Sequence, residues 1–194
     1  KNGSVQVIRP KDKELKRAGK AVAQLMTDGF SHRSLPELSA LLEHADQRIR
    51  QAAQFAMVEK GELAVAKLNE ILGDKEFSLL AKLHSIWGLG QLARNGYSES
   101  VTPLILNMLE NKEIEIRANA ARVAGSSNLL KLGSSLLELL KDPSPRVASL
   151  AALSLGRIGS KSDPLLVSTI LHSVEQNKGA DFDPVLRHSF ISAL

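Results

Sequence analysis

The sequence predicts an all-α protein, an α-solenoid of about five helix pairs behind an N-terminal capping helix. From Leu35 onward, an apolar helix, a short polar turn and a second apolar helix with a basic residue in its first turn recur along the chain. These basic residues are spaced by 32, 35, 29 and 41 residues, and periods of this size are typical of helical repeats. Aromatic residues make up only 4% of the chain, too few for a typical β-sandwich core. The aligned basic positions are Arg50, Lys82, Arg117, Arg146 and Arg187.

The chain divides into a non-repeat part, residues 1–34, and a repeat array, residues 35–194. In the first part we expect an extended segment over 1–11 and a helix over about 12–28. This helix places apolar residues on one face and caps the first repeat, because the end of an array needs a polar outer face. The apolar residues are Leu15, Ala18, Val22, Leu25 and Met26. The approximate repeats are 35–61, 62–96, 98–125, 128–159 and 162–194.

Two further positions recur in the second helices. Six residues after the basic position the chain has small residues in four copies, which lets paired helices approach closely. Four residues before it an acid occurs in four copies, followed at once by proline in two of them, and this is a signal for the start of a helix. We expect these acids and the arginines to form a structural ladder along the array. Its members are Arg50, Arg117, Arg146, Arg187, Asp46, Asp142 and Asp183.

The segment from Asp142 to Ala148, with its D-P-x-x-R pattern before a helix of small residues, resembles HEAT repeats and HEAT-like repeats of the phycobilisome-lyase type. The resemblance covers about residues 35–194. It implies an armadillo-like helical array, and such arrays serve many different partners.

A second resemblance concerns the setting of the array. Residues 48–55, 82–89 and 183–188 are similar to the HEAT segment of large envelope proteins of planctomycete type. In those proteins a propeller similar to sugar dehydrogenases precedes the repeats and a c-type cytochrome domain follows them. The resemblance implies a segment of a larger multidomain protein linked to electron transfer, in the periplasm or cell envelope; otherwise a cytoplasmic location is expected. A chain that begins at Lys1 and ends within an apolar helix also leads us to expect a segment of a longer protein.

No pattern for catalysis or for a cofactor occurs. The chain has no cysteine, which excludes disulfides, zinc–thiolate sites, iron–sulfur clusters, a cysteine nucleophile and the haem motif C-x-x-C-H. The histidines lack metal-ligand spacing, and neither a nucleophile elbow nor a phosphate loop is present. No apolar stretch is long enough to span a membrane. We therefore predict a non-catalytic chain without cofactor, metal or membrane span.

The prediction for function concerns the surface of the second helices. In HEAT-like arrays these helices line the concave side, and one stripe on them contains aromatic and arginine side chains of the kind that dominate protein interfaces. The stripe comprises Phe55, His84, Trp87, Asn119 and Arg122. It predicts a protein-interaction scaffold or spacer whose partner is another domain of the same chain or a separate protein. The alternative for the two aromatic residues is that they fill gaps between helices.

A nucleic-acid-binding array, similar to DNA glycosylases built from HEAT-like repeats, is the alternative function. Residues 1–34 contain eight Lys/Arg and three Asp/Glu, whereas the remaining residues contain seventeen and eighteen. A basic stretch can bind nucleic acid or be a solvated helix face. Because the array itself has a net charge of −1, nucleic acid is not the expected partner.

Overall fold

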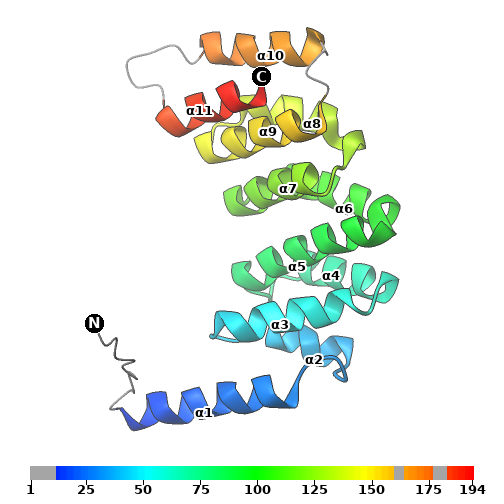
Figure 1. Cartoon of the computed structure of the whole chain (residues 1–194), viewed down its shortest axis with the longest axis vertical. Helices are drawn as coiled ribbons and strands as arrows, with labels where there is room; N and C mark the ends of the chain where they lie inside the picture. Colours follow the sequence, from blue (N-terminus) through cyan, green and yellow to red (C-terminus); the bar gives the residue numbers. More distant parts are fainter. Residues whose placement is uncertain (1–11, 160–163, 177–182) are drawn as a thin grey trace, which may run out of the picture.

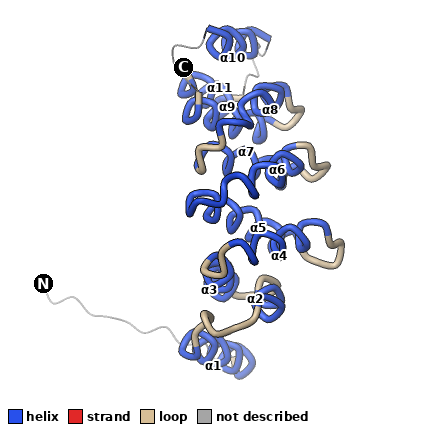
Figure 2. The backbone as a smooth tube through the Cα atoms, turned by 90° about the vertical axis from the view of Figure 1, so that its right-hand side faces the viewer, coloured by secondary structure: helices blue, strands red, loops and turns tan. Residues whose placement is uncertain are grey.

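The structure, a computed structural model, describes residues 12–159, 164–176 and 183–194, and within these ranges it is helical throughout, without strands (Figures 1 and 2). The predicted extended segment 1–11 lies outside the described residues. Helix α1 (Lys13–Asp28) precedes the array and begins at Asp12, whose carboxylate accepts hydrogen bonds from the backbone N–H groups of Glu14 and Leu15.

Five helix pairs follow α1 in the described part of the chain, so the predicted α-solenoid is confirmed. The first helices of the pairs are α2 (Leu35–Leu41), α4 (Glu62–Gly73), α6 (Ser98–Leu109), α8 (Gly133–Glu138) and α10 (Pro164–Gln176). The second helices are α3 (Gln47–Val58), α5 (Leu79–Leu92), α7 (Ile114–Ser126), α9 (Pro145–Ile158) and α11 (Pro184–Ala193). Shorter elements are a π-helical turn (Ala93–Tyr97) and two 3₁₀ turns (Leu130–Leu132 and Leu139–Lys141).

The pairs are stacked in chain order, with the second helices along one side of the molecule and α2, α4, α6 and α8 along the other, while α10 lies across the end of the array (Figure 1). Each second helix packs on the next, from α3 through α5, α7 and α9 to α11. Apolar side chains between the two rows are fully buried, for example Leu38, Ile71, Ile86 and Ile105. A continuous core of this kind forms only when neighbouring repeats cover each other's apolar faces.

Two glycines that the repeat alignment did not single out allow close contacts between the backbones of successive second helices. A Cβ atom on Gly125 would lie 2.5 Å from the Cβ of Ser154, and one on Gly156 would lie 2.8 Å from the Cα of Ala193. Both distances are shorter than van der Waals contact allows. The stacking of α7, α9 and α11 therefore depends on the absence of a side chain at these positions.

The helix-start signals before the second helices are used in different ways. Asp46 and Asp183 are N-caps, and the carboxylate of Asp183 accepts from the backbone N–H groups of Val185 and Leu186. The expectation that Asp142 caps α9 is wrong. Ser144 occupies the N-cap, α9 begins at Pro145, and the Asp142 carboxylate is held by the backbone N–H of Ser144 and by Arg117 of the preceding repeat.

Helix α1 buries less apolar surface than its pattern predicts. Val22 is buried and Leu25 packs partly against the core, but Leu15, Ala18 and Met26 are exposed. The reason is that α1 meets the array mainly through its contact with α3. Most of its apolar face therefore has no neighbour among the described residues.

Candidate functional site

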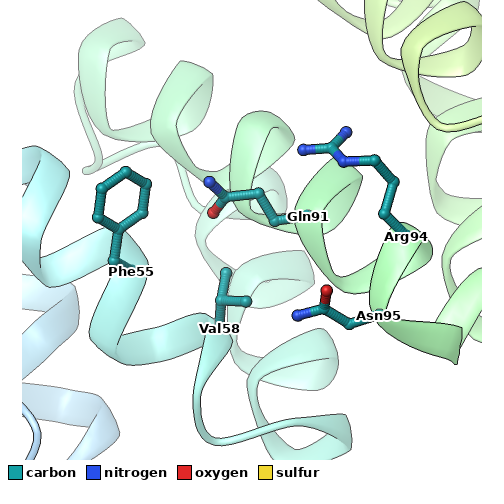
Figure 3. A pocket seen from close by; sticks show the side chains of 5 residues that line it. All are labelled: Phe55, Val58, Gln91, Arg94 and Asn95. Carbon is teal, nitrogen blue, oxygen red and sulfur yellow. The ribbon is translucent and has the colours of Figure 1, made fainter.

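A hollow lies between α3 and the end of α5 (Figure 3). It has a volume of about 220 Å³ and is lined by Phe55, Val58, Gln91, Arg94 and Asn95. Phe55 and Val58 project from α3, and Gln91 and Asn95 face them from the opposite side. The Phe55 side chain is 45% exposed although it is apolar. The hollow thus combines an apolar wall with amide and guanidinium groups.

A second hollow, of about 320 Å³, continues from the first between α5 and α7. The two share Gln91 and Arg94, so they form one surface across three successive second helices. We call this surface the central groove. Besides the residues of the first hollow, it is lined by Trp87, Arg122, Val123 and Ser126.

The structure brings three of the five predicted stripe residues to this groove. Phe55 and Arg122 are exposed in its walls, and Trp87 is half-buried in its floor. The expectation that His84 and Asn119 belong to the same surface is wrong, because they are only 3% and 4% exposed. Both lie at the contact between successive second helices, where they hydrogen-bond to neighbouring side chains.

His84 belongs to a buried chain of hydrogen bonds that links α3 to α5. The Nε of Arg50 donates to His84 Nε2 over 3.3 Å, so the ring proton resides on Nδ1, which lies 2.8 Å from Gln54 Oε1. Gln54 Nε2 in turn donates to Gln91 Oε1 over 3.0 Å. Burial, together with the positive charge of Arg50, lowers the pKa of His84 to about 4. The imidazole is therefore neutral at physiological pH, and the chain of bonds ends at the groove residue Gln91.

Asn119 fixes Trp87 in place. The indole N–H of Trp87 donates to Asn119 Oδ1 over 2.9 Å, and Asn119 Nδ2 donates to the backbone carbonyl of Glu115. The rings of His84 and Trp87 also meet edge to face, with centroids 4.9 Å apart. Trp87 thus fills part of the α5–α7 contact and also lines the groove, and its role in binding a partner stays a prediction.

The predicted ladder of arginines is irregular. Arg117 pairs with Asp142 of the following repeat over 2.7 Å, and Arg146 pairs with Glu115 of the preceding repeat over 2.9 Å. The hydrogen bond to Asp142 raises the pKa of Arg117. Pairing of Arg50 with Asp46 does not occur. Arg50 instead donates to the backbone carbonyls of His44 and Ala45.

Asp46 pairs with a different arginine. Its carboxylate accepts from Arg48 over 2.7 Å, and this hydrogen bond lowers the pKa of Asp46 to about 2. Arg187 is exposed and makes no ion pair with any described acid. Ion pairs of the first-turn arginines therefore connect neighbouring repeats only in the middle of the described array, whereas Arg50 reaches the next repeat through its hydrogen bond to His84.

Sequence reasoning missed Gln91, Arg94 and Asn95. Arg94 and Asn95 belong to the turn Ala93–Tyr97 after α5, within which the chain kinks at Gly96 with φ 103°. The Asn95–Gly96 pair, a typical helix break, is the signal that could have drawn attention to this position.

Within the described residues, no group of histidine and acidic side chains is placed to hold a metal ion. No helix in that part of the chain has the length and apolar character needed to cross a membrane.

An array of helix pairs stacked in one direction, with hollows between its second helices, defines an α-solenoid repeat protein. Residues 101–194 match the family model of HEAT repeats. The array thus has the fold of HEAT-like repeats, and the match to the family itself lies in its second half.

Two similar proteins illustrate the relationship. The bilin biosynthesis protein MpeU of Synechococcus sp. (strain WH8020) is 37% identical over 75 residues, which are 38% of this chain and 25% of that protein. This chain thus spans about a quarter of the length of that relative. A designed armadillo repeat protein, solved in complex with the peptide (KR)4, superposes with a TM-score of 0.52 at 16% identity, covering 95% of this chain and 93% of the other. This second likeness concerns the fold alone.

Proposed function

We propose that this chain is a protein-interaction scaffold that binds an extended segment of a partner protein in the central groove. The observation that carries the proposal is the continuity of the groove across α3, α5 and α7, where Phe55 is exposed and polar groups surround it. Aromatic and arginine side chains are the usual anchors of protein interfaces. Repeat arrays provide extended binding surfaces of this kind.

The similar proteins support this class of partner. The designed armadillo repeat protein is described in complex with a peptide, and its helical array extends over nearly the same length. The repeat fold also favours a non-catalytic role. We further propose that residues 1–34 act as a cap for the array over 35–194. The electron-transfer setting stays a prediction from the resemblance to envelope proteins.

A site-specific photo-crosslink tests the proposal. Benzoylphenylalanine in place of Phe55 puts a reactive group into the groove with little change in shape. The matched control has the same group in place of Leu63, which is equally apolar and 73% exposed on α4, on the side of the first helices. We expect illumination in a lysate of the source cells to attach a protein at position 55 and not at position 63. Equal attachment at both positions, or none at 55, would contradict the proposal.

A second candidate is a role in bilin biosynthesis, favoured by the identity with MpeU. In that case the chain acts on a bilin or on the protein that carries one. Titration of a free bilin into the purified chain tests it, because binding changes the visible absorption spectrum of the pigment. An unchanged spectrum would leave the scaffold proposal as the better one.

A further inference from the structure

Charged residues are sorted between the two sides of the array. The second helices contain eight Arg/Lys residues and one acid, Glu115. The first helices contain six acids and one basic residue, Lys67. The net charge of −1 of the array conceals this separation. The side that contains the central groove is therefore basic.

Most arginines at the first turn of the second helices are already engaged. Arg48, Arg117 and Arg146 form ion pairs with acids, and Arg50 is buried and donates to two backbone carbonyls. An arginine whose donors are occupied in this way contributes little to binding another molecule. The charge that is available for a ligand thus lies elsewhere on this side.

Besides the engaged Arg50, five cations of this side form no ion pair with a described acid, namely Lys82, Arg94, Arg122, Arg157 and Arg187. Of these, Arg94 and Arg122 line the same hollow. Both side chains are exposed, and within the described residues neither forms an ion pair. Arg94 Nη1 donates to Ser127 Oγ over 3.0 Å, and Ser127 Oγ donates to the carbonyl of Gly90. This anchor orients the Arg94 guanidinium and leaves its other N–H groups for a ligand.

No acidic residue of the described chain lines either hollow. Two guanidinium groups beside one hollow repel each other, and an anion placed between them relieves this repulsion. A carboxylate is well suited, because it accepts two parallel hydrogen bonds from one guanidinium.

We propose that the partner segment in the central groove is acidic, with Asp or Glu side chains on Arg94 and Arg122 and an apolar side chain against Phe55. The inference rests on the proposed function and names the chemistry of the partner. A protein segment fits better than nucleic acid, because phosphates at regular intervals need a row of free cations beside the groove, whereas the arginines at the first turns of α3 and α7 are engaged. The apolar side chains of Phe55 and Val58 also offer no favourable contact to a phosphate backbone.

Trp87 provides a readout at the site itself. It is the only tryptophan of the chain, and it lines the hollow that Arg94 and Arg122 share. Its fluorescence and the NMR signal of its indole N–H therefore report binding in the groove. The probe is a short synthetic peptide of alternating Asp and Glu with one central leucine. The comparison probes are the same peptide with Asn and Gln, the same peptide with Lys and Arg, and a single-stranded oligonucleotide.

We expect the acidic peptide alone to shift the Trp87 signals. Arg94→Gln and Arg122→Gln should each weaken its binding by about 10-fold or more, because each removes a charge-assisted contact. The matched control is Lys131→Gln, an exposed cation that pairs with Glu99 of α6 on the opposite side. This variant should bind the peptide as the unmodified chain does.

Three results would overturn the inference: no response to the acidic peptide at millimolar concentration, an equal response to the uncharged peptide, or tighter binding of the oligonucleotide with a steep salt dependence.

Photo-crosslinking at position 55 distinguishes a failure of the acidic-partner inference from a failure of the scaffold proposal. If the crosslink to a protein persists undiminished in the Arg94→Gln/Arg122→Gln variant, the acidic partner is wrong and the scaffold proposal stands. If no protein is attached at position 55 in any variant, the scaffold proposal itself fails.

Discussion

Helix α7 passes through two regions with different surroundings, the contact with the following repeat at its first turn and the central groove further along, and it places one arginine in each. At its first turn, Arg117 lies in a nearly closed contact with Asp142, with side chains 13% and 5% exposed. One and a half turns later, Arg122 is exposed in the central groove without an acidic partner in the described chain. The two residues belong to the same helix and to the same side of the molecule, yet one is enclosed and paired and the other is open.

From this difference we propose that one residue type serves two purposes in this repeat array. A paired, enclosed arginine is needed for folding, because its removal leaves a buried carboxylate without a counter-charge. An exposed arginine without a partner contributes little to stability and is available for a ligand. An exposed, unpaired arginine of this kind is a candidate for binding, because the stability of the fold does not require it. Each of the following predictions tests one side of this comparison.

The largest effect is expected from Arg117→Ala. The variant leaves the Asp142 carboxylate unpaired and removes the donor to the carbonyls of Asn111 and Lys112. We expect the free energy of unfolding to fall by about 3 kcal/mol, measured by urea denaturation followed by circular dichroism. The Arg117→Ala/Asp142→Ala double variant should lose less than the sum of the two single variants. A loss below about 1 kcal/mol in the single variant would show that this pair is not enclosed.

The second prediction concerns pH and the buried His84. Its pKa is about 4 in the folded chain, against an ordinary value of 6.5. Between these pH values the unfolded chain binds a proton that the folded chain does not. The contribution of the neutral His84 to the free energy of unfolding is therefore fully present above pH 6.5. It decreases as the pH is lowered toward 4, by up to about 1.4 kcal/mol per pH unit.

Urea denaturation at several pH values from neutral to about 4.5 measures this slope. His84→Gln is the control, since glutamine does not titrate and the slope due to His84 should disappear. If the variant and the unmodified chain lose stability equally over this range, His84 is not the responsible group.

A smaller effect is expected from the two groove aromatics. Trp87→Phe removes the donor to the buried Asn119 and should lower the free energy of unfolding by about 1 kcal/mol. Phe55→Ala should change it by less, because the Phe55 side chain is largely open to solvent. Circular dichroism during urea denaturation measures both. A larger loss for Phe55→Ala would mean that Phe55 fills a gap between helices rather than lining a binding surface.

The repeat architecture could be predicted from the sequence because stacking requires the same residue types at the same places in each copy. Buried Ala56, Ala152 and Ala193 follow the predicted small position. The amphipathic pattern of α1 was not sufficient, because whether an apolar face is covered depends on the neighbouring helix, as exposed Leu15 illustrates.

The groove was predicted only in part, for a similar reason. Phe55 and Arg122 could be found by counting along a helix face, but the same count placed His84 and Asn119 on the surface. Their burial depends on the partners Gln54 and Trp87 in adjacent repeats. Arg94 and Asn95 were missed because they lie in the kinked turn after α5, outside the helix face along which the stripe was counted.

The most direct test of the central claim is the stability of Arg122→Gln, measured by urea denaturation beside Arg117→Gln. Each change removes one positive charge from α7 and introduces the same polar glutamine side chain. We predict that Arg122→Gln stays within about 0.5 kcal/mol of the unmodified chain, whereas Arg117→Gln loses about 3 kcal/mol. A loss of more than about 1 kcal/mol for Arg122→Gln would contradict the account, because Arg122 would then be an arginine that the fold itself requires.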